Sequence, residues 1–486
     1  MIVIFFNTVY IIHHRKLEKR EIEMKRYVLF VCLLLSGLAG VYAQSIAPFQ
    51  KGDRIAFVGN SITCGGHYHS YIWLYYMTRF PDQRIDIFNE GVGGDVAEMI
   101  YQRLDKVFEH EPTVVTLSFG MNDVGYMDFR KPGADTIARN RVEKACRDYA
   151  LIEEVYKKYP EVRKILIGSS PYDETSRFNK VAFPGKNTPI LEIVDFLNAR
   201  ARENQWGFVD FNSPMVAINQ WEQAADSMYT LCGKDRIHPS TDGHLVMAYL
   251  FLKAQGLAGK PVADIRIDGA GKKVTRSDNS PGRVSDLSVS SDNLTFTYEA
   301  KSLPYPIDTS YYDNEKHTQA DALSVIPFMD EMNYEGLSVS GLLDGYYGLT
   351  IGGEFIGRFT ARELERGINM ALLQNTPQYK QAMKIRQMNE ERWLKERKMR
   401  EFYWVEYNLM RKTGMLWACN EAAVDTLRKY RPHDIFLQWN GALWLQYMHK
   451  GIREDCVNEQ QDLVNQIYEQ NKPIPLRIEI KKFTDL

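Results

Sequence analysis

The chain has 486 residues, 44% of them hydrophobic, which is enough for two or three domains with sizeable cores. Sixty basic and 62 acidic residues give a formal charge of −2, which argues against a general polyanion binder but not against a local basic groove. The six cysteines include no C-x-x-C pair, so neither a disulfide framework nor a zinc site is indicated.

The first 43 residues have the pattern of a targeting segment. A basic stretch at 24–26 precedes an apolar run at 27–38, and residues 41–43 fit a small-residue cleavage site before Gln44. Residues 1–23 are then an upstream extension. A membrane anchor is the alternative, although the apolar run is short for a membrane span. We expect cleavage near Ala43–Gln44 and a periplasmic or secreted protein without stable membrane insertion.

Residues 50–257 alternate between short apolar runs and helical patterns. The predicted strands are 54–58, 84–88, 113–118, 163–168 and 207–211, and the predicted helices are 70–79, 95–108, 138–158, 190–204 and 242–255. Such βαβ alternation predicts a parallel sheet covered on both faces. Five strands favour a flavodoxin-like order over a closed eight-stranded barrel.

The pattern changes after residue 258. Residues 262–268 and 293–298 alternate like strands with one exposed face, and residues 346–359 predict a hairpin that turns at Gly352-Gly353. We therefore divide the chain into the targeting segment 1–43, a domain at 44–260, a β-rich segment at 261–359 and a helical region at 360–486.

The helical region begins with a capping box. Thr360 and Glu363 predict a helix with an apolar face at Leu364, Ile368 and Leu372. Thr376-Pro377 starts a helix predicted to run to Gly414, and residues 476–480 predict a last strand. Charged side chains on the long helix favour a solvated face over a nucleic-acid site: Arg392, Lys395, Glu396, Arg397 and Lys398.

Ser61 follows the first predicted strand by two residues. Ligands of open α/β sheets bind at the carboxyl ends of the strands, so this hydroxyl can face a substrate there. Thr63 replaces the second glycine of a G-x-S-x-G elbow. Taken alone, a serine at this position is more often a helix cap than a nucleophile.

Two further polar positions follow the next two strands. Gly94 lets a backbone N–H approach an oxyanion closely, and the Asn122 side-chain amide can donate to developing negative charge. Ordinary turns are the alternative for both positions. Four nearby tyrosines are candidates for stacking on sugar rings, with plain packing as the alternative: Tyr68, Tyr71, Tyr126 and Tyr172.

Asp235 precedes His238 by three residues. An aspartate at this spacing can bind the imidazole Nδ1–H and leave Nε2 free to accept a serine proton. His67 and His69 lack such an acid nearby in sequence, so we interpret them as pocket lining or helix surface. Cys64 and Cys232 flank these positions, and two free buried thiols are favoured over a disulfide.

Together these residues resemble the SGNH family of GDSL-type esterases and acylhydrolases. Gly59-Asn-Ser61-Ile-Thr63 is similar to the family's serine block, with Asn60 in place of the usual aspartate. Gly94, Asn122 and the Asp235–His238 pair match the other three blocks in family order.

The resemblance covers about residues 50–257. It implies a three-layer α/β/α, flavodoxin-like domain with a five-stranded parallel sheet in the order 2-1-3-4-5, and no metal or cofactor. It also implies Ser61 as nucleophile, His238 as general base and then acid, and Asp235 as its orienting group. The oxyanion hole would combine the N–H groups of Ser61 and Gly94 with the Asn122 amide. The remainder, with its β-hairpin and helices, resembles only loosely the C-terminal extensions of some SGNH proteins from polysaccharide-degrading bacteria.

The sequence therefore predicts an exported serine esterase that hydrolyses short-chain esters, chiefly acetyl, on carbohydrates. A lysophospholipase or lipase is the alternative within the same chemistry. A non-catalytic glycan-binding protein on this scaffold is the alternative from another class. The presence of all the residues that the resemblance assigns to the site argues against that alternative.

Overall fold

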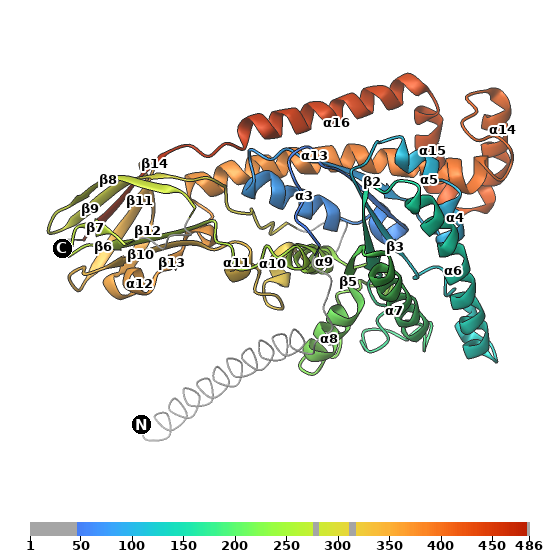
Figure 1. Ribbon diagram of the computed structural model, residues 1–486, viewed down its shortest axis with the longest axis horizontal. Coiled ribbons are helices and arrows are strands. Elements are labelled where there is room, and N and C mark those ends of the chain that lie inside the picture. The colour runs from blue at the N-terminus through green and yellow to red at the C-terminus, as the bar shows by residue number, and fades with distance from the viewer. Residues whose placement is uncertain (1–45, 276–280, 311–316, 484–486) are drawn as a thin grey trace, which may run out of the picture. The chain divides into compact units, whose positions relative to one another are not determined.

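Five apolar runs pair as one parallel sheet in the computed structural model, which describes residues 46–275, 281–310 and 317–483 (Figure 1). Sheet A comprises β1 (Arg54–Gly59), β2 (Asp86–Gly91), β3 (Val114–Phe119), β4 (Arg163–Gly168) and β5 (Gly207–Asp210). Its order is β2-β1-β3-β4-β5, so the predicted flavodoxin-like topology is confirmed. The predicted signal peptide, its cleavage site and Cys32 lie outside the described residues.

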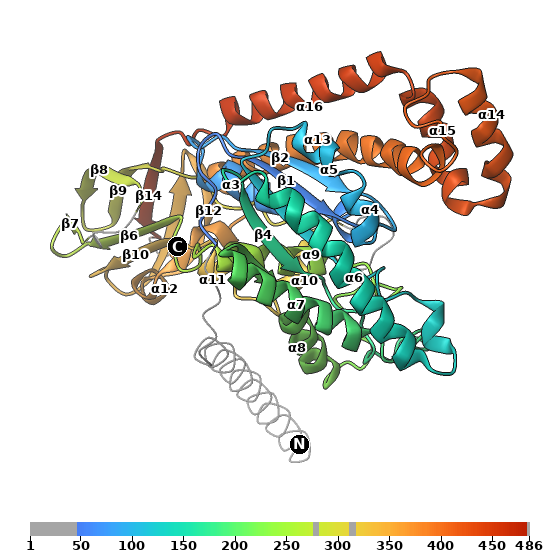
Figure 2. The same cartoon turned by 45° about the vertical axis from the view of Figure 1, so that its right-hand side comes forward.

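Helices cover both faces of sheet A, which explains why its strands are almost continuously apolar. Figure 2 shows α6 and α7 on one side of the sheet, and α3 and α9 pack against each other on the other. The helices are α2 (Ser61–Cys64), α3 (Tyr68–Arg79), α4 (Ala97–Tyr101), α5 (Leu104–Phe108), α6 (Ala134–Lys157), α7 (Asn187–Asn204), α8 (Asn212–Gln223) and α9 (Thr241–Ala254), with a 3₁₀ turn η1 (Met127–Arg130).

The predicted helix 95–108 is wrong as one helix. It breaks at Arg103, which lies between α4 and α5 with φ −130° and ψ 11°, outside the helical region. The buried Arg103 guanidinium donates to Asp95 Oδ2 at 2.7 Å and to the carbonyl oxygens of Glu90 and Gly59 at 2.9 and 3.2 Å. These inward contacts explain the break. Helix α8 was not predicted.

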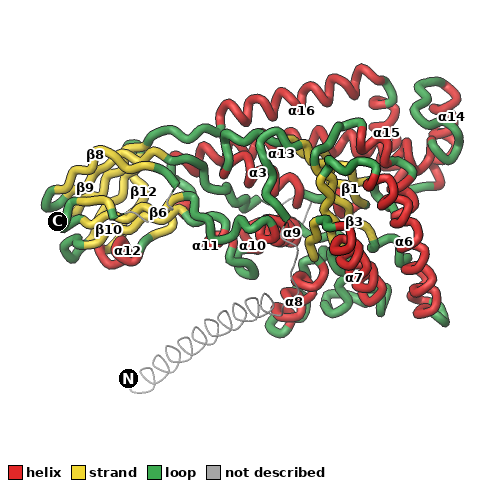
Figure 3. Tube along the Cα trace, viewed as in Figure 1, coloured by secondary structure: helices red, strands yellow, loops and turns green. Residues whose placement is uncertain are grey.

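Two further sheets follow sheet A in sequence. Sheet B has the order β13-β10-β6-β7, and antiparallel sheet C has the order β12-β11-β14-β9-β8. Figure 3 shows their strands together in yellow, with α12 close by. The elements are β6 (Ala263–Asp268), β7 (Lys273–Val274), β8 (Arg283–Val289), β9 (Asn293–Glu299), α10 (Gln319–Ala322), α11 (Phe328–Glu331), β10 (Glu335–Ser340), β11 (Tyr346–Ile351), β12 (Glu354–Thr360), β13 (Ile368–Asn369) and β14 (Leu476–Lys482).

The predicted hairpin and capping box are confirmed. Gly352 and Gly353 connect β11 to β12 with φ values of +60° and +86°, and Thr360 and Glu363 cap each other's backbone groups at the start of α12 (Ala361–Arg366). The helix does not extend to Leu372 as predicted. Gly367 at φ +92° ends it, because a left-handed backbone cannot continue a right-handed helix.

The last region is mainly helical: η2 (Met370–Leu372), α13 (Pro377–Val405), the π-helical turn η3 (Glu406–Met410), α14 (Glu421–Tyr430), η4 (Arg431–His433), α15 (Ile435–Tyr447) and α16 (Lys450–Gln470). The long helix begins at Pro377 as predicted, but its α-helical part ends at Val405 instead of near Gly414. After α16 the chain returns to sheet C as β14. The domain boundaries at 260 and 360 stay predictions. Within the described ranges, no helix is both long and apolar enough to cross a membrane.

Candidate active site

Ser61 is the first residue of α2, immediately beyond the carboxyl end of β1. Asn60 caps this short helix, since its Oδ1 accepts the Ile62 N–H at 3.0 Å. Gly59 must be small, because a Cβ there would lie 2.3 Å from Thr63 Oγ1. The capping by Asn60 explains how asparagine can stand where the family has aspartate.

A hydrogen-bonded chain links Ser61, His238 and Asp235. His238 Nε2 lies 2.8 Å from Ser61 Oγ, and His238 Nδ1 lies 2.5 Å from Asp235 Oδ2. The other oxygen, Asp235 Oδ1, accepts the backbone N–H groups of Ile237 and His238 at 2.9 Å each. This geometry fixes the imidazole with Nε2 toward the serine hydroxyl, as proton transfer from a serine requires.

The charge on Asp235 is stabilised locally. Burial alone would raise the pKa of Asp235, but the hydrogen bonds from His238 and from two backbone N–H groups lower it by more, so the net pKa lies below the usual value. The side chains of His238 and Asp235 are 45% and 49% exposed, so the site is open to solvent. Asp235 is therefore ionised at neutral pH and can stabilise an imidazolium.

Arg236, whose role was not predicted from the sequence, holds this loop in place. Its guanidinium is buried and donates to the carbonyl oxygens of Asp173 at 2.9 Å, Ser176 at 2.8 Å and Asn179 at 2.7 Å. Its position between Asp235 and His238 was the feature of the sequence that could have pointed to this role. An arginine is rarely fully buried, however, and sequence alone does not reveal its carbonyl partners.

Gly94 and Asn122 lie on the loops after β2 and β3. Gly94 adopts a φ of +85°, which favours glycine, and a Cβ there would meet nothing within 4 Å, so the space around it is open. One N–H of the Asn122 amide donates to the Asp95 carbonyl at 3.0 Å, and its Oδ1 accepts the Tyr126 hydroxyl at 2.6 Å. The amide is thus held at two points, and the contact with Asp95 uses one of its two N–H groups.

Lys186 supports the Asn122 loop from beneath. This fully buried ammonium donates to the carbonyl oxygens of Met121 at 2.7 Å and Gly125 at 2.5 Å, on either side of Asn122. It also lies 3.8 Å from the centre of the Tyr126 ring. Burial lowers the pKa of Lys186 to about 7. Neither Lys186 nor the positioning contact of Tyr126 was identified from sequence, because both depend on chain segments that meet only in the fold.

The remaining candidate residues of the sequence analysis are mostly buried. Tyr68, Tyr71 and Tyr172 are each 1% exposed, so they pack inside the protein and cannot stack on a sugar. His69 is completely buried, which corrects its interpretation as pocket lining or helix surface, and burial lowers its pKa to about 4. Cys64 and Cys232 are free thiols, as favoured, although Cys64 is only half-buried.

The larger cavities lie away from Ser61. One of about 540 Å³ is lined by Ile46, Arg163 and Trp206 near the amino ends of β4 and β5, and one of about 810 Å³ lies between α5 and α16. None of Ser61, Asp235 and His238 lines either cavity. We place the site at the hydrogen-bonded chain, because ligands of parallel sheets bind at the carboxyl ends of the strands.

Comparison with known proteins identifies the family. The model of the GDSL-like lipase/acylhydrolase family matches residues 57–246, and that of the diltiazem deacetylase C-terminal helical domain matches residues 383–472. A solved structure described as a gut microbial diltiazem-metabolizing enzyme is 42% identical, covers 91% of this chain and 100% of its own, and superposes with a TM-score of 0.88. The chain belongs to the GDSL-like lipase/acylhydrolase family.

This acylhydrolase is accordingly a carboxylic ester hydrolase. It is also similar to the acetylxylan esterase of Geobacillus stearothermophilus, with 23% identity over 227 residues that cover 42% of this chain and 95% of that protein. The match to this relative therefore leaves more than half of this chain without a counterpart.

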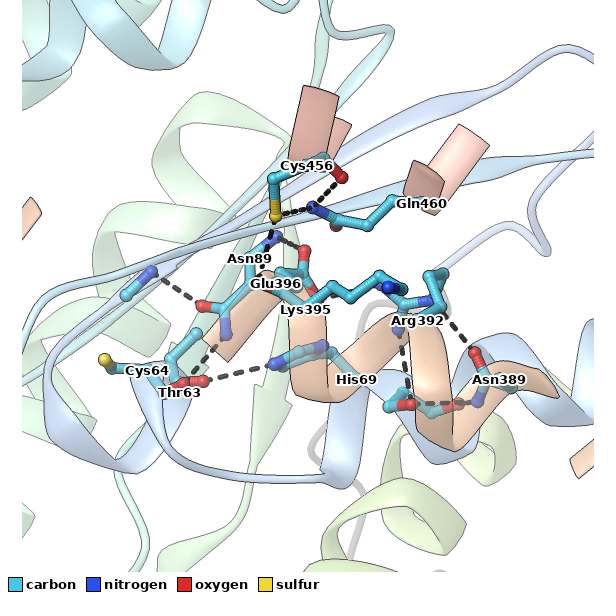
Figure 4. Close-up of polar contacts among 12 residues, drawn as sticks. Thr63, Cys64, His69, Asn89, Asn389, Arg392, Lys395, Glu396, Cys456 and Gln460 are labelled. Carbon is cyan, nitrogen blue, oxygen red and sulfur yellow. Dashed lines mark hydrogen bonds and ion pairs between the residues drawn. The ribbon is translucent and has the colours of Figure 1, made fainter. Parts of the chain in front are cut away.

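In this acylhydrolase, hydrogen bonds through Asn89 connect the C-terminal helices to α2, the helix that begins with Ser61. Figure 4 shows Glu396 of α13 accepting the Asn89 backbone N–H at 2.9 Å, while the Asn89 side-chain amide donates to the Cys64 carbonyl at 2.9 Å. Cys64 is the last residue of α2, which starts with Ser61. A segment more than 300 residues away in sequence thus holds the helix that carries the serine.

The same network corrects the predicted solvated face of α13. Arg392 and Glu396 are only 2% and 8% exposed, and they pair with each other at 2.9 Å. Arg392 Nε also donates to Asn389 Oδ1 at 3.0 Å, and the guanidinium carbon of Arg392 lies 4.4 Å from the centre of the Trp73 ring. These two charged side chains face the protein interior because α13 packs against α3 and β2.

Proposed function

We propose that this acylhydrolase is an exported serine esterase that removes acetyl groups from carbohydrates. The observation that carries the proposal is the Ser61–His238–Asp235 hydrogen-bonded chain, at the edge of the sheet where the loops with Gly94 and Asn122 also begin. An acetyl substrate on a glycan is supported by the similarity to the Geobacillus acetylxylan esterase. Export rests on the signal-peptide pattern alone.

The proposed mechanism follows from the distances. Ser61 Oγ attacks the ester carbonyl while His238 Nε2, 2.8 Å away, accepts the hydroxyl proton. Asp235 stabilises the resulting imidazolium. The Ser61 and Gly94 N–H groups and the remaining Asn122 amide N–H receive the oxyanion. His238 then returns the proton to the leaving alcohol, and water repeats the sequence on the acyl-enzyme to release the acid.

A second candidate substrate class is the acetate ester of a ring-bearing small molecule such as diltiazem. It is favoured by the diltiazem-metabolizing enzyme, which is 42% identical and includes the C-terminal helical region. Both candidates share the acetyl group and differ in the alcohol. Acetate release and deacetylated product can be measured for both in one experiment.

The test compares the wild type with Ser61→Ala on acetylated xylo-oligosaccharides, on diltiazem and on p-nitrophenyl esters from acetyl to dodecanoyl. We expect the fastest p-nitrophenyl cleavage with acetyl, acetate release from a glycan, and no turnover by the variant. Retention of more than a few per cent of activity by Ser61→Ala would refute the serine mechanism. A maximum at octanoyl or longer, with no acetate from any glycan, would favour the lipase alternative. Sequencing the secreted protein should find Gln44 at its N-terminus.

A further inference from the structure

An indole from the C-terminal helices lies beside the proposed oxyanion loop. A Cβ at Gly93 would be 3.1 Å from Cδ1 and 3.3 Å from Nε1 of Trp404, which belongs to α13. Gly93 immediately precedes Gly94. The absence of a side chain at Gly93 therefore allows the Trp404 ring to approach within one residue of the proposed N–H donor.

Two more aromatic rings continue outward from Trp404. The ring centres of Trp404 and Phe436 are 5.5 Å apart, and those of Phe436 and Trp439 are 5.4 Å apart. Phe436 is 50% exposed and Trp439 is 65% exposed. We call these three residues the aromatic strip. It starts at the site loop and ends in solvent on α15, which lies beside the end of α13 in Figure 1.

Contacts at both ends of α15 position the aromatic strip. Asp434 caps α15 by accepting the N–H groups of Phe436 at 2.8 Å and Leu437 at 3.2 Å, which sets the first turn. Trp439 follows Phe436 by three residues, so both rings lie on one face of the helix. On its inner side α15 is anchored by buried Trp444, whose Nε1 donates to Glu406 Oε1 at 2.7 Å.

The exposure of the strip requires an explanation. Large aromatic side chains gain most by burial, and contiguous exposed apolar patches often mark binding sites. The strip is continuous with the Gly93–Gly94 loop, so a molecule bound there is placed against the reacting ester. By contrast, the tyrosines that the sequence suggested for stacking near Ser61 are mostly buried.

We propose that the aromatic strip binds the alcohol portion of the ester substrate, and that it selects alcohols with a flat or pyranose ring. This rests on the proposed function, in which Ser61 attacks the ester carbonyl. The acyl group would lie at Ser61 and Gly94, and the ring of the alcohol would extend over Trp404 toward Phe436 and Trp439. The C-terminal helices thus supply a specificity surface that sheet A lacks.

The test uses Phe436→Ala, Trp439→Ala and the double variant with three esters of one acid. The alcohols are ethanol, 4-methylumbelliferone and xylotriose. For each enzyme, kcat/KM for a ring-bearing ester is divided by kcat/KM for the ethyl ester. This ratio in a variant is then compared with the same ratio in the wild type, because the comparison cancels differences in leaving-group reactivity. We expect each substitution to lower this ratio about 2- to 13-fold, as ring stacking is worth about 0.5–1.5 kcal/mol. The double variant should lower it more.

The matched control is Phe355→Ala on β12, where the side chain is 60% exposed and the ratio should stay at the wild-type value. An unchanged ratio in the strip variants, or equal losses on all three esters, would overturn the proposal. So would a change of oligomeric mass in light scattering, since the strip would then join two copies of the chain. The acid is acetic acid, or whichever acid the wild type releases fastest. A wrong proposal about the acetyl group can therefore be distinguished from a wrong proposal about the aromatic strip.

Discussion

Tyr126→Phe tests whether the Asn122 amide must be held in place for catalysis. The substitution removes the hydroxyl that donates to Asn122 Oδ1 at 2.6 Å and leaves the ring, which still contacts the Lys186 ammonium. Burial raises the pKa of Tyr126 above its usual value, so the hydroxyl keeps its proton at neutral pH and acts as the donor. Without it, one of the two contacts that orient the amide is lost.

The expected size of the effect follows from this single hydrogen bond. A net contribution of about 0.5–1.5 kcal/mol predicts that kcat for p-nitrophenyl acetate falls about 2- to 13-fold, with KM little changed. Asn122→Ala should lower kcat about 10²–10³-fold, since it removes an oxyanion donor. If Tyr126 acts only through Asn122, adding Tyr126→Phe to Asn122→Ala should change kcat no further, because residues in one network are not additive.

The decisive measurement is therefore the double-mutant cycle. Equal losses from Tyr126→Phe in both backgrounds would show that Tyr126 acts independently of Asn122 and would refute the reasoning. Tyr379→Phe is the matched control. Tyr379 lies on the long helix α13, and the substitution removes a buried hydroxyl that donates to the Ile307 carbonyl at 2.9 Å. Both tyrosine variants should lose similar stability in urea, but only Tyr126→Phe should lose kcat.

Three further predictions concern the charged groups. Asp235→Asn should reduce turnover severely, because the amide can hold the wrong His238 tautomer and cannot offset imidazolium charge; near-normal kcat would mean that another group orients the histidine. Arginine and histidine neighbours outweigh the cost of burial and lower the pKa of Glu90 to about 2, so its contribution to stability is complete above about pH 4.5 and is lost as the pH falls toward 2. Urea unfolding at several pH values should show this loss in the wild type and not in Glu90→Gln. The same dependence of unfolding free energy on pH in both proteins would contradict the prediction. Glu396→Ala leaves a buried guanidinium unpaired and should cost about 3–5 kcal/mol of unfolding free energy. Lys395→Ala removes a partly exposed ion pair with Glu459 and should cost about 0–1 kcal/mol, and similar losses for both variants would argue against the buried network.

Features that depend on neighbours in sequence could be predicted well. The five strands of sheet A are short apolar runs, and their parallel order follows from the alternation with helices. The hairpin at Gly352-Gly353 and the capping box at Thr360 depend on contacts over at most a few residues. The end of α12 at Gly367 was missed because the apolar spacing of Ile368 and Leu372 continued past a backbone that had already left the helix.

The Asp-x-x-His spacing by itself singled out the Asp235–His238 pair, which lies between α8 and α9. The sequence also determined that Ser61, Gly94 and Asn122 meet at the candidate site, because each follows a strand of one parallel sheet. The carboxyl ends of such strands share one edge, so the topology alone gathers them. Only the tertiary structure decided what supports and surrounds that edge. Examples are the hydrogen bond between Glu396 and Asn89, which are more than 300 residues apart, and the packing of Trp404 against Gly93.

The physical reason lies in the range of the interactions. Whether a charged residue such as Arg392 faces water or the interior depends on which helix packs against it, and α13 carries charged residues on several sides. Periodicity in one segment describes a possible face but not the partner that covers it. The burial of Arg392 and Glu396, and the exposure of Phe436 and Trp439, are consequences of how distant segments pack together.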